Sequence, residues 1–162
     1  MNTIEERLAA LEREVAALRA DNDIRTVLSH YAIGVDEKRP HLLRELFADD
    51  AVLGVPAWAV EVHGVEAIMQ FFENYWGRFD NPRRYYANED IRVAGDRASA
   101  FMYWHVTQEL GTESVLGWGT YEWGFRRRNS DGRWLIARET VHIRAMTTLA
   151  AGWAAQAVPL QL

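Results

Sequence analysis

Apolar residues near the start of the chain recur with the spacing of a coiled-coil helix. The alternating steps of four and three residues are made by Ile4, Leu8, Leu11, Val15 and Leu18. They predict a helix from Thr3 to Ala20, with Thr3 and Glu6 as a capping box. About two and a half heptads are too few to stand alone, so we expect this helix to pack on a partner subunit or on its own domain.

Polar residues at positions 21–23 are expected to end this first helix and to begin a second one. Asp23 is a suitable N-cap, and an apolar face from Ile24 to Val35 follows it. After Pro40, a third, short helix is expected from His41 to Phe47. The next predicted elements are two short strands, a longer helix and a loop, at Ala51–Val55, Val60–His63, Gly64–Trp76 and 80–82.

The spacing of apolar residues changes from helical to alternating after Pro82, which predicts a run of strands. Four strands separated by turns are expected at about 83–94, 97–110, 114–127 and 133–146. Helices that precede an antiparallel meander indicate an α+β fold, in which the helices cover one face of a curved sheet. The apolar tail at 147–162 has no clear period, and we expect it to cover a pocket or an interface.

Alternation within the strands predicts which side chains face the helices. The even face of 97–110 is the more apolar one, and two glycines on the odd face of the next strand, Gly117 and Gly119, indicate a cavity. In the last strand the apolar odd face contains Glu139, and a carboxylate there is costly unless it is paired or protonated. Aromatic rings on the outward faces predict an interface, and hence a homo-oligomer (dimer or trimer): Phe101, Tyr103, Trp118 and Trp134.

Composition fits one folded domain with a core, since the 162 residues are 49% hydrophobic and 25% charged. The absence of cysteine excludes disulfides, thiolate zinc sites and a cysteine nucleophile, and it fits a cytoplasmic location. We expect neither a membrane span nor a signal peptide, because no apolar run reaches about 18 residues and the N-terminus is acidic. A formal net charge of −5 argues against nucleic acid as a partner. The histidines lack ligand spacing and no phosphate-binding loop is present, so we expect no metal and no cofactor.

Four segments of the chain, taken in order, resemble one known family. They are Tyr31–Asp36 (YAIGVD), Leu42–Val52 (LLRELFADDAV), Gly64–Ile68 (GVEAI) and Val93–Ala98 (VAGDRA). Together they resemble the SnoaL-like branch of the nuclear transport factor 2-like superfamily over roughly residues 22–146, which leaves 1–21 as an N-terminal helical extension. The resemblance implies a cone-shaped α+β barrel, with helices packed on a curved antiparallel sheet around an internal pocket. The branch includes scytalone and bile-acid dehydratases and hexachlorocyclohexane dehydrochlorinase.

Two residues of the second predicted helix, Tyr31 and Asp36, match positions that carry chemistry in this branch. In relatives similar to the dehydrochlorinase, the aspartate orients a histidine that removes a proton. Here Asn88 matches an asparagine near that histidine, and the histidine's slot holds Arg84 and Tyr85. Arg84 is therefore expected to pair with Asp36 or to bind an anionic substrate.

The predicted catalytic residues are Tyr31, Asp36 and Glu139. Asp36 would take or relay a proton, and Glu139 would be a buried acid or base. Tyr31 would polarise a substrate oxygen together with Tyr85 or Tyr86. A structural interpretation competes with each role: an ion pair for either carboxylate and a core ring for the tyrosine. The predicted substrate-binding residues are Arg84, Tyr85, Tyr86, Met102, Trp104, Gln108, Tyr121 and Trp123.

Three functions agree with these features. The first is a cofactor-independent lyase of the dehydratase type, or an isomerase, that acts on a small hydrophobic cyclic molecule by acid/base catalysis. The second is a non-catalytic protein that binds a hydrophobic ligand, which the missing histidine favours. The third is an assembly subunit like the β subunit of a ring-hydroxylating dioxygenase, which the N-terminal heptads favour.

Overall fold

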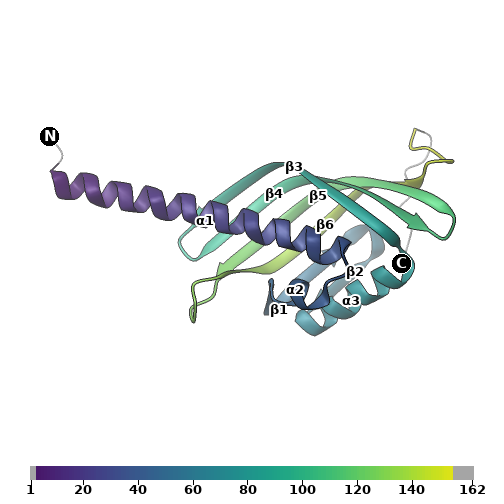
Figure 1. Ribbon diagram of the computed structural model, residues 1–162, viewed down its shortest axis with the longest axis horizontal. Helices are drawn as coiled ribbons and strands as arrows, with labels where there is room; N and C mark the ends of the chain where they lie inside the picture. Colours follow the sequence, from purple (N-terminus) through teal and green to yellow (C-terminus); the bar gives the residue numbers. More distant parts are fainter. Residues whose placement is uncertain (1–2, 155–162) are drawn as a thin grey trace.

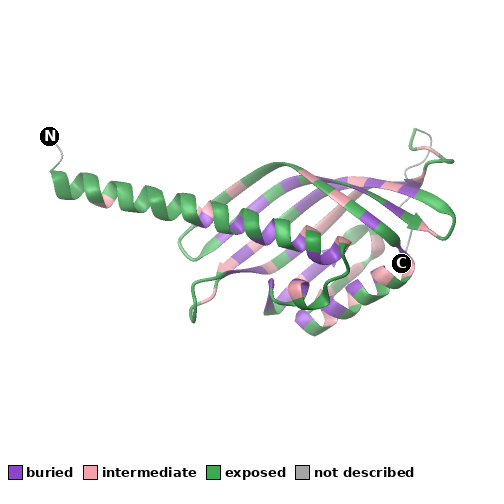
Figure 2. Cartoon of the chain, viewed as in Figure 1, coloured by how far each residue is buried: buried purple, intermediate pink, exposed green. Residues whose placement is uncertain are grey.

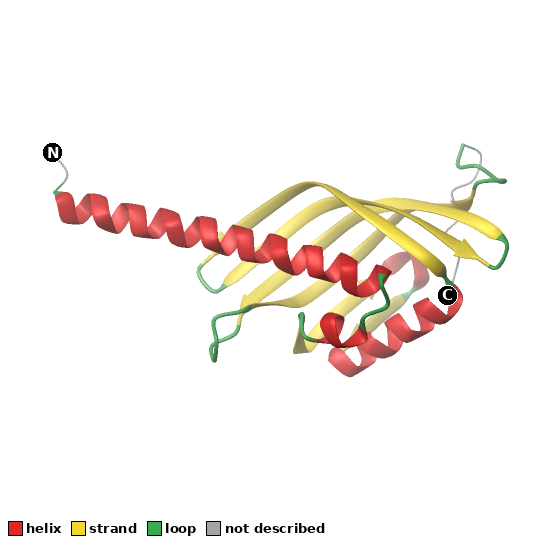
Figure 3. Ribbon diagram, viewed as in Figure 1, coloured by secondary structure: helices red, strands yellow, loops and turns green. Residues whose placement is uncertain are grey.

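Three helices cover one face of a curved six-stranded sheet in the computed structural model, which describes residues 3–154 (Figure 1, Figure 3). The helices are α1 (Ile4–Asp36), α2 (Pro40–Arg44) and α3 (Val65–Arg78), and a 3₁₀ turn, η1, spans Pro56–Trp58. The strands are β1 (Phe47–Val55), β2 (Val60–His63), β3 (Asp80–Ala94), β4 (Arg97–Leu110), β5 (Glu113–Arg127) and β6 (Trp134–Thr148). The predicted α+β class is confirmed.

The sheet is mixed and open, with the strand order β2-β1-β6-β5-β4-β3. Neighbouring strands are antiparallel except for β1 and β6, which run parallel. The predicted antiparallel meander is therefore confirmed for β3 to β6. Strand β1 is added to the sheet beside β6 and runs parallel to it. This curved sheet turns its concave face toward α1 and α3 (Figure 1). Residues from the sheet and from both helices line the candidate site.

One continuous helix replaces the two that the sequence predicts at the N-terminus. Because α1 runs through residues 21–23 without interruption, the predicted break there is wrong. None of these three residues is glycine or proline, and Arg25 Nε donates a hydrogen bond to Asp21 Oδ2 at 2.8 Å, one helical turn away. The predicted capping box of Thr3 and Glu6 is confirmed.

Two other element boundaries differ from the sequence-based prediction. Helix α2 ends at Arg44 instead of Phe47, because Phe47 begins β1 and is in register with Ile136 of β6. The predicted loop at 80–82 is the start of β3, where Asn81 has a positive φ of 49° and the register with β4 is irregular. In both places long-range strand pairing overrides local turn and helix signals.

Burial along the central strands confirms most of the predicted side-chain orientations. In β4 the even residues are buried, and in β6 Glu139 has an exposure of 0%. Trp134 was predicted to face outward, and this is wrong, because its exposure is only 3%. The register of β5 against β6 shifts between Gly124 and Phe125, which changes the alternation at the start of β6.

The cavity that the sequence predicted at the two glycines of β5 is not there. The glycines allow close packing instead. A Cβ at Gly119 would lie 1.9 Å from the carbonyl oxygen of His142, and one at Gly117 would lie 3.1 Å from Cε of Met146. The edge of the Trp104 ring fills the remaining space beside both glycines. The glycines thus let β6 and a large ring approach the β5 backbone.

Two of the predicted outward rings, Phe101 and Tyr103, are 37% and 49% exposed and lie edge to face with centroids 5.6 Å apart. Trp118 is only half-buried and packs against Trp153, at 5.8 Å between centroids. The interface predicted at these rings stays a prediction. Half of the predicted covering tail, residues 155–162, lies outside the described residues. None of the described helices has the length and apolar character that crossing a bilayer requires.

Candidate functional site

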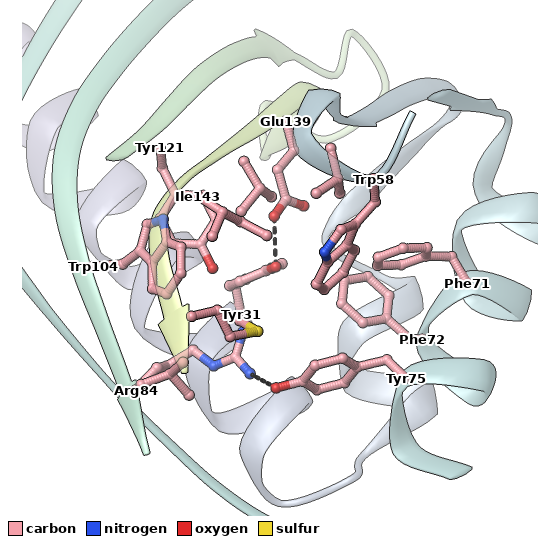
Figure 4. Close-up of a pocket in the computed structure, with 14 residues that line it drawn as sticks. Tyr31, Trp58, Phe71, Phe72, Tyr75, Arg84, Trp104, Tyr121, Glu139 and Ile143 are labelled. Carbon is pink, nitrogen blue, oxygen red and sulfur yellow. Dashed lines mark hydrogen bonds between the residues drawn. The ribbon is translucent and has the colours of Figure 1, made fainter. Parts of the chain in front are cut away.

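A small cavity lies between the concave face of the sheet and the helices, and half of its lining residues are aromatic (Figure 4). Its volume is about 50 Å³, which is room for a few water molecules. The aromatic wall is formed by Trp58, Phe71, Phe72, Trp104 and Tyr121. Four polar side chains also reach the cavity, namely Tyr31, Tyr75, Arg84 and Glu139. A few polar groups in an apolar cavity are typical of a site for a small molecule.

Glu139 is a carboxylic acid held in this apolar cavity. Tyr31, from α1, donates a hydrogen bond to Glu139 Oε1 at 2.6 Å, whereas Oε2 has no hydrogen-bond partner among residues 3–154. Burial raises the pKa of Glu139 to about 8, although the Tyr31 hydrogen bond and the positive charge of Arg84 both act to lower it. Glu139 is therefore mostly protonated at neutral pH, and its Oε2 is a buried carboxyl oxygen left unpaired by the described residues.

Asp36 and Arg84 form an ion pair at the end of α1. Arg84 Nε lies 2.6 Å from Asp36 Oδ1, and the backbone N–H of Arg84 donates to Oδ2 at 2.7 Å. The two side chains are only 10% and 7% exposed, respectively. The nearby Lys38 pairs with Asp80 instead, at 3.2 Å. Since both oxygens of Asp36 accept hydrogen bonds from Arg84, this carboxylate holds the guanidinium in place.

Arg84 continues this polar network toward the cavity. Its Nη2 donates to the hydroxyl of Tyr75 at 3.3 Å, and that hydroxyl donates in turn to Oε1 of the buried Gln108. The guanidinium carbon lies 6.0 Å from the centroid of the Tyr31 ring. An arginine stays protonated at any physiological pH, so it can stabilise an anion but cannot remove a proton.

The phenol groups of the site stay protonated. Burial raises the pKa of Tyr31 well above its usual value, and the neighbouring Glu139 raises it further. Burial likewise raises the pKa of Tyr75. Both hydroxyls are therefore hydrogen-bond donors, which leaves Glu139 as the cavity residue that titrates near neutrality.

The structure brings only some of the predicted substrate-binding residues to the cavity. Trp104 and Tyr121 line it together with Arg84, and Gln108 reaches it through Tyr75. Three others lie in the core beside the cavity and do not line it: Met102, Trp123 and Tyr86. Tyr86 packs edge to face on Tyr121 at 5.7 Å between centroids.

Tyr85 does not reach the cavity and is 67% exposed. It neighbours Arg84 on β3, and successive strand residues point to opposite faces, so one of the two must face away. The same alternation leaves His105 exposed on β4. His142 is half-buried, with Nε2 lying 3.5 Å from Glu122. Residues 3–154 hold no group of three His, Asp or Glu side chains able to bind a metal.

The lining residues that the sequence did not identify as part of the site include four aromatic ones: Trp58, Phe71, Phe72 and Tyr75. For Tyr75 a signal was present, because it continues the buried helical stripe of α3 three residues after Phe72. No such signal marks Trp58, which lies in the short η1 turn between two strands. Residues in irregular segments show no period from which their direction can be predicted.

Replacing Tyr31 with phenylalanine is expected to shift the titration of Glu139 to higher pH. The Tyr31 hydroxyl favours the ionised carboxylate through its hydrogen bond, so its removal leaves the effect of burial less opposed. The midpoint can be followed by ¹³C NMR of the Glu139 carboxyl carbon. Tyr86→Phe is the matched control, because the buried Tyr86 hydroxyl has no hydrogen-bond partner among the described residues. An unchanged midpoint in Tyr31→Phe would contradict the Tyr31–Glu139 hydrogen bond.

Comparison with known proteins agrees with this fold. The family model for the SnoaL-like domain matches residues 16–140. No curated protein matches the chain. Hexachlorocyclohexane dehydrochlorinase LinA-type3 from Novosphingobium barchaimii LL02 is similar, with a TM-score of 0.78 and 24% identity over 86% of this chain and 96% of that one. A scytalone dehydratase-like protein from Novosphingobium aromaticivorans DSM 12444 has a TM-score of 0.74 and 19% identity over 88% and 93%.

Proposed function

This chain belongs to the SnoaL-like domain family, and we propose that it is a cofactor-independent lyase of the dehydratase type acting on a small, hydrophobic, cyclic molecule. One observation carries the proposal: Glu139 lines an apolar cavity together with Arg84 and Tyr75, and one of its carboxyl oxygens has no partner among residues 3–154. Elimination of water needs one group that moves a proton and another that stabilises negative charge. The similar structures named as a dehydrochlorinase and as scytalone dehydratase-like agree with elimination chemistry.

The proposed reaction begins with the ionised form of Glu139. Its carboxylate removes a proton from the carbon beside a substrate carbonyl, and the electron pair moves onto the carbonyl oxygen to give an enolate. The enolate then re-forms the carbonyl and a carbon–carbon double bond while hydroxide leaves from the next carbon. Glu139 returns its proton to that hydroxide, so the products are an unsaturated carbonyl compound and water. A pKa of about 8 suits this role, because both protonation states are accessible near neutral pH.

Arg84 is proposed to stabilise the enolate oxygen, and the Tyr75 hydroxyl, which donates its proton to Gln108, helps to hold the guanidinium. Asp36 then has a positioning role, since it accepts one hydrogen bond from the guanidinium of Arg84 and a second from the Arg84 backbone N–H. In this proposal the acid/base group lies on β6, and the residue beside Asp36 is a permanent cation. The proposed mechanism therefore does not need the histidine that relatives have at this position. Tyr31 orients Glu139 and lowers its pKa through the hydrogen bond.

A non-catalytic binding function is the second candidate, and it is favoured by the slot of the family's histidine, which here holds Arg84 and Tyr85. About 50 Å³ accommodates little more than solvent, so a cyclic ligand has to displace part of the aromatic wall. Trp58, from the short η1 turn, and Phe71, at the same side of the cavity, are the rings we expect to move (Figure 4).

A panel of cyclic β-hydroxy ketones tests both candidates. Product formation is measured as the ultraviolet absorbance of the conjugated ketone, at pH values on either side of the Glu139 pKa. The matched control panel contains the same ketones without the hydroxyl, which can bind but cannot lose water. Turnover of the hydroxy ketones supports the lyase. Thermal stabilisation by both panels without any product would overturn it and favour the binding protein.

A further inference from the structure

The N-terminal half of α1 extends beyond the sheet, and no other element of the described chain covers it (Figure 1, Figure 2). Its apolar side chains are the ones with coiled-coil spacing, and they are exposed by between 44% and 85%: Ile4, Leu8, Leu11, Val15 and Leu18. In contrast, the second half of the same helix buries Ile24 and Tyr31 against the sheet. The sequence analysis expected this helix to pack either on a partner subunit or on its own domain. The described part of its own domain does not cover the stripe.

The stripe lies on the side of α1 that faces away from the sheet. At 100° per residue, Leu11 and Leu18 point in nearly the opposite direction to Ala20, Ile24 and Tyr31, which are buried. A second helix can therefore lie along the stripe without touching the domain to which α1 is attached.

Heptad positions can be assigned from the spacing. Ile4, Leu11 and Leu18 take position d, and Leu8 and Val15 take position a. The next a position is Asn22, which is exposed and in line with the stripe. A single asparagine at position a is a known means of fixing the register and the number of strands in a parallel coiled coil.

The charges that flank the stripe complement each other in a parallel pair. Positions g and the following e bring Arg7 beside Glu12 of the partner subunit, and Glu14 beside Arg19 of the partner subunit. Each contact occurs twice in a symmetric dimer. Each antiparallel register mixes opposite-charge and like-charge contacts: one sets Arg7 against Glu14 but also Glu5 against Glu12, and the other sets Glu5 against Arg19 but also Glu14 against itself. The parallel register has no like-charge contact at these positions.

We propose that residues 4–22 form a parallel, in-register, two-stranded coiled coil with a second copy of this chain. The segment is about 27 Å long. A free peptide of this length would pay a high cost to start a helix, but here the helix is already fixed by its second half, which is packed on the sheet. The coiled coil therefore needs only the burial of its apolar stripe and the four charge pairs.

Disulfide cross-linking tests the register, because the natural chain contains no cysteine. In a parallel, in-register dimer the two copies of residue 4 are adjacent at position d, so Ile4→Cys is expected to give a covalent dimer on oxidation. In an antiparallel pair these residues lie near opposite ends of the helices and cannot react. A dimer that fails to cross-link at this position would overturn the proposed register.

Sedimentation equilibrium over a concentration series tests the surface. Leu11→Asp is expected to weaken the dimer by about tenfold or more, because an apolar core side chain is replaced by a charge. Ala10→Asp adds the same charge at an exposed position outside the stripe and is expected to leave the dimer intact. A wild-type chain that stays monomeric, or an oligomer that Leu11→Asp does not weaken, would overturn the proposal. The second result would point to the face with Phe101 and Tyr103.

A charge-reversal pair distinguishes this dimer from other uses of the same helix. Arg7→Glu places like charges opposite Glu12 of the partner subunit and is expected to weaken the dimer. Arg7→Glu/Glu12→Arg restores both contacts in the parallel register and is expected to recover it. Because both residues lie outside the folded domain, thermal unfolding should stay at the wild-type temperature when measured on monomer. Failure of the double variant to recover dimerisation would contradict the g-to-e contacts.

Discussion

Replacing Glu139 with glutamine is expected to make the folding stability much less dependent on pH. The wild-type protein should lose roughly 5 kcal/mol of stability between pH 4.5 and pH 8 through this one group, and the variant should not. In the unfolded chain this carboxyl group ionises near its ordinary pKa of 4.5, whereas in the folded protein it keeps its proton up to about pH 8. Between these values the native state binds one proton more than the unfolded state. Stability therefore falls by about 1.4 kcal/mol for each unit that the pH rises.

Denaturant unfolding of both proteins across this pH range measures the effect. The other titrating groups are common to the two proteins, so the difference between their curves isolates Glu139. The difference should change little below pH 4.5 and should level off above pH 8, with the glutamine variant then favoured. Glu122→Gln is a control on β5, because that side chain is 63% exposed. Parallel curves for the wild type and Glu139→Gln would mean that Glu139 titrates normally and is not buried in solution.

The same variant is expected to lose turnover by about 10²- to 10⁴-fold. Glutamine has nearly the same shape and its oxygen still accepts the Tyr31 hydrogen bond, but it cannot carry a proton. For the wild type, kcat/KM is expected to rise with pH up to about 8, because the reaction starts from the carboxylate. Wild-type rates in the glutamine variant would show that the buried carboxyl is structural, whatever its pKa.

Glu139 was found from the sequence because its neighbours made it an anomaly. Strand residues alternate strictly, so a carboxylate in phase with Leu135, Val141 and Ile143 had to point inward. Its partner could not be found in this way, since Tyr31 lies 108 residues earlier and only the folded chain brings them together. The same applies to Tyr75, whose hydroxyl links two polar groups from different strands.

The wrong predictions have a different cause, namely local irregularities that periodicity cannot register. A register shift placed Trp134 in the core, and close backbone packing took the space attributed to Gly117 and Gly119. By contrast, the pairing of Asp36 with Arg84 was one of two alternatives, and the structure forms it. That pair followed from a resemblance of motifs, because its residues lie 48 positions apart on a helix and a strand.

Replacing Arg84 with methionine is expected to destabilise the fold by about 3–5 kcal/mol. Methionine fills much of the space of the arginine stem, but it leaves the carboxylate of Asp36 only 10% exposed and without a counter-charge. Of the two hydrogen bonds that Asp36 now accepts from residue 84, only the one from the backbone N–H would remain. Arg83→Met is the matched control on the same strand, because Arg83 is 51% exposed and only 3.5 Å from Glu37 in a solvated pair.

The double variant Arg84→Met/Asp36→Asn separates loss of the pair from loss of packing. Asparagine removes the buried charge and can still accept from the Arg84 backbone, so the double variant is expected to be more stable than Arg84→Met alone. The four free energies of unfolding, measured at one pH, give the coupling between the two side chains. A coupling near zero would mean that the guanidinium does not neutralise Asp36. That result would also contradict the proposal that Asp36 positions the guanidinium. A large coupling, together with turnover lost in Arg84→Met but partly kept in Asp36→Asn, is what a positioned anion-stabilising arginine requires.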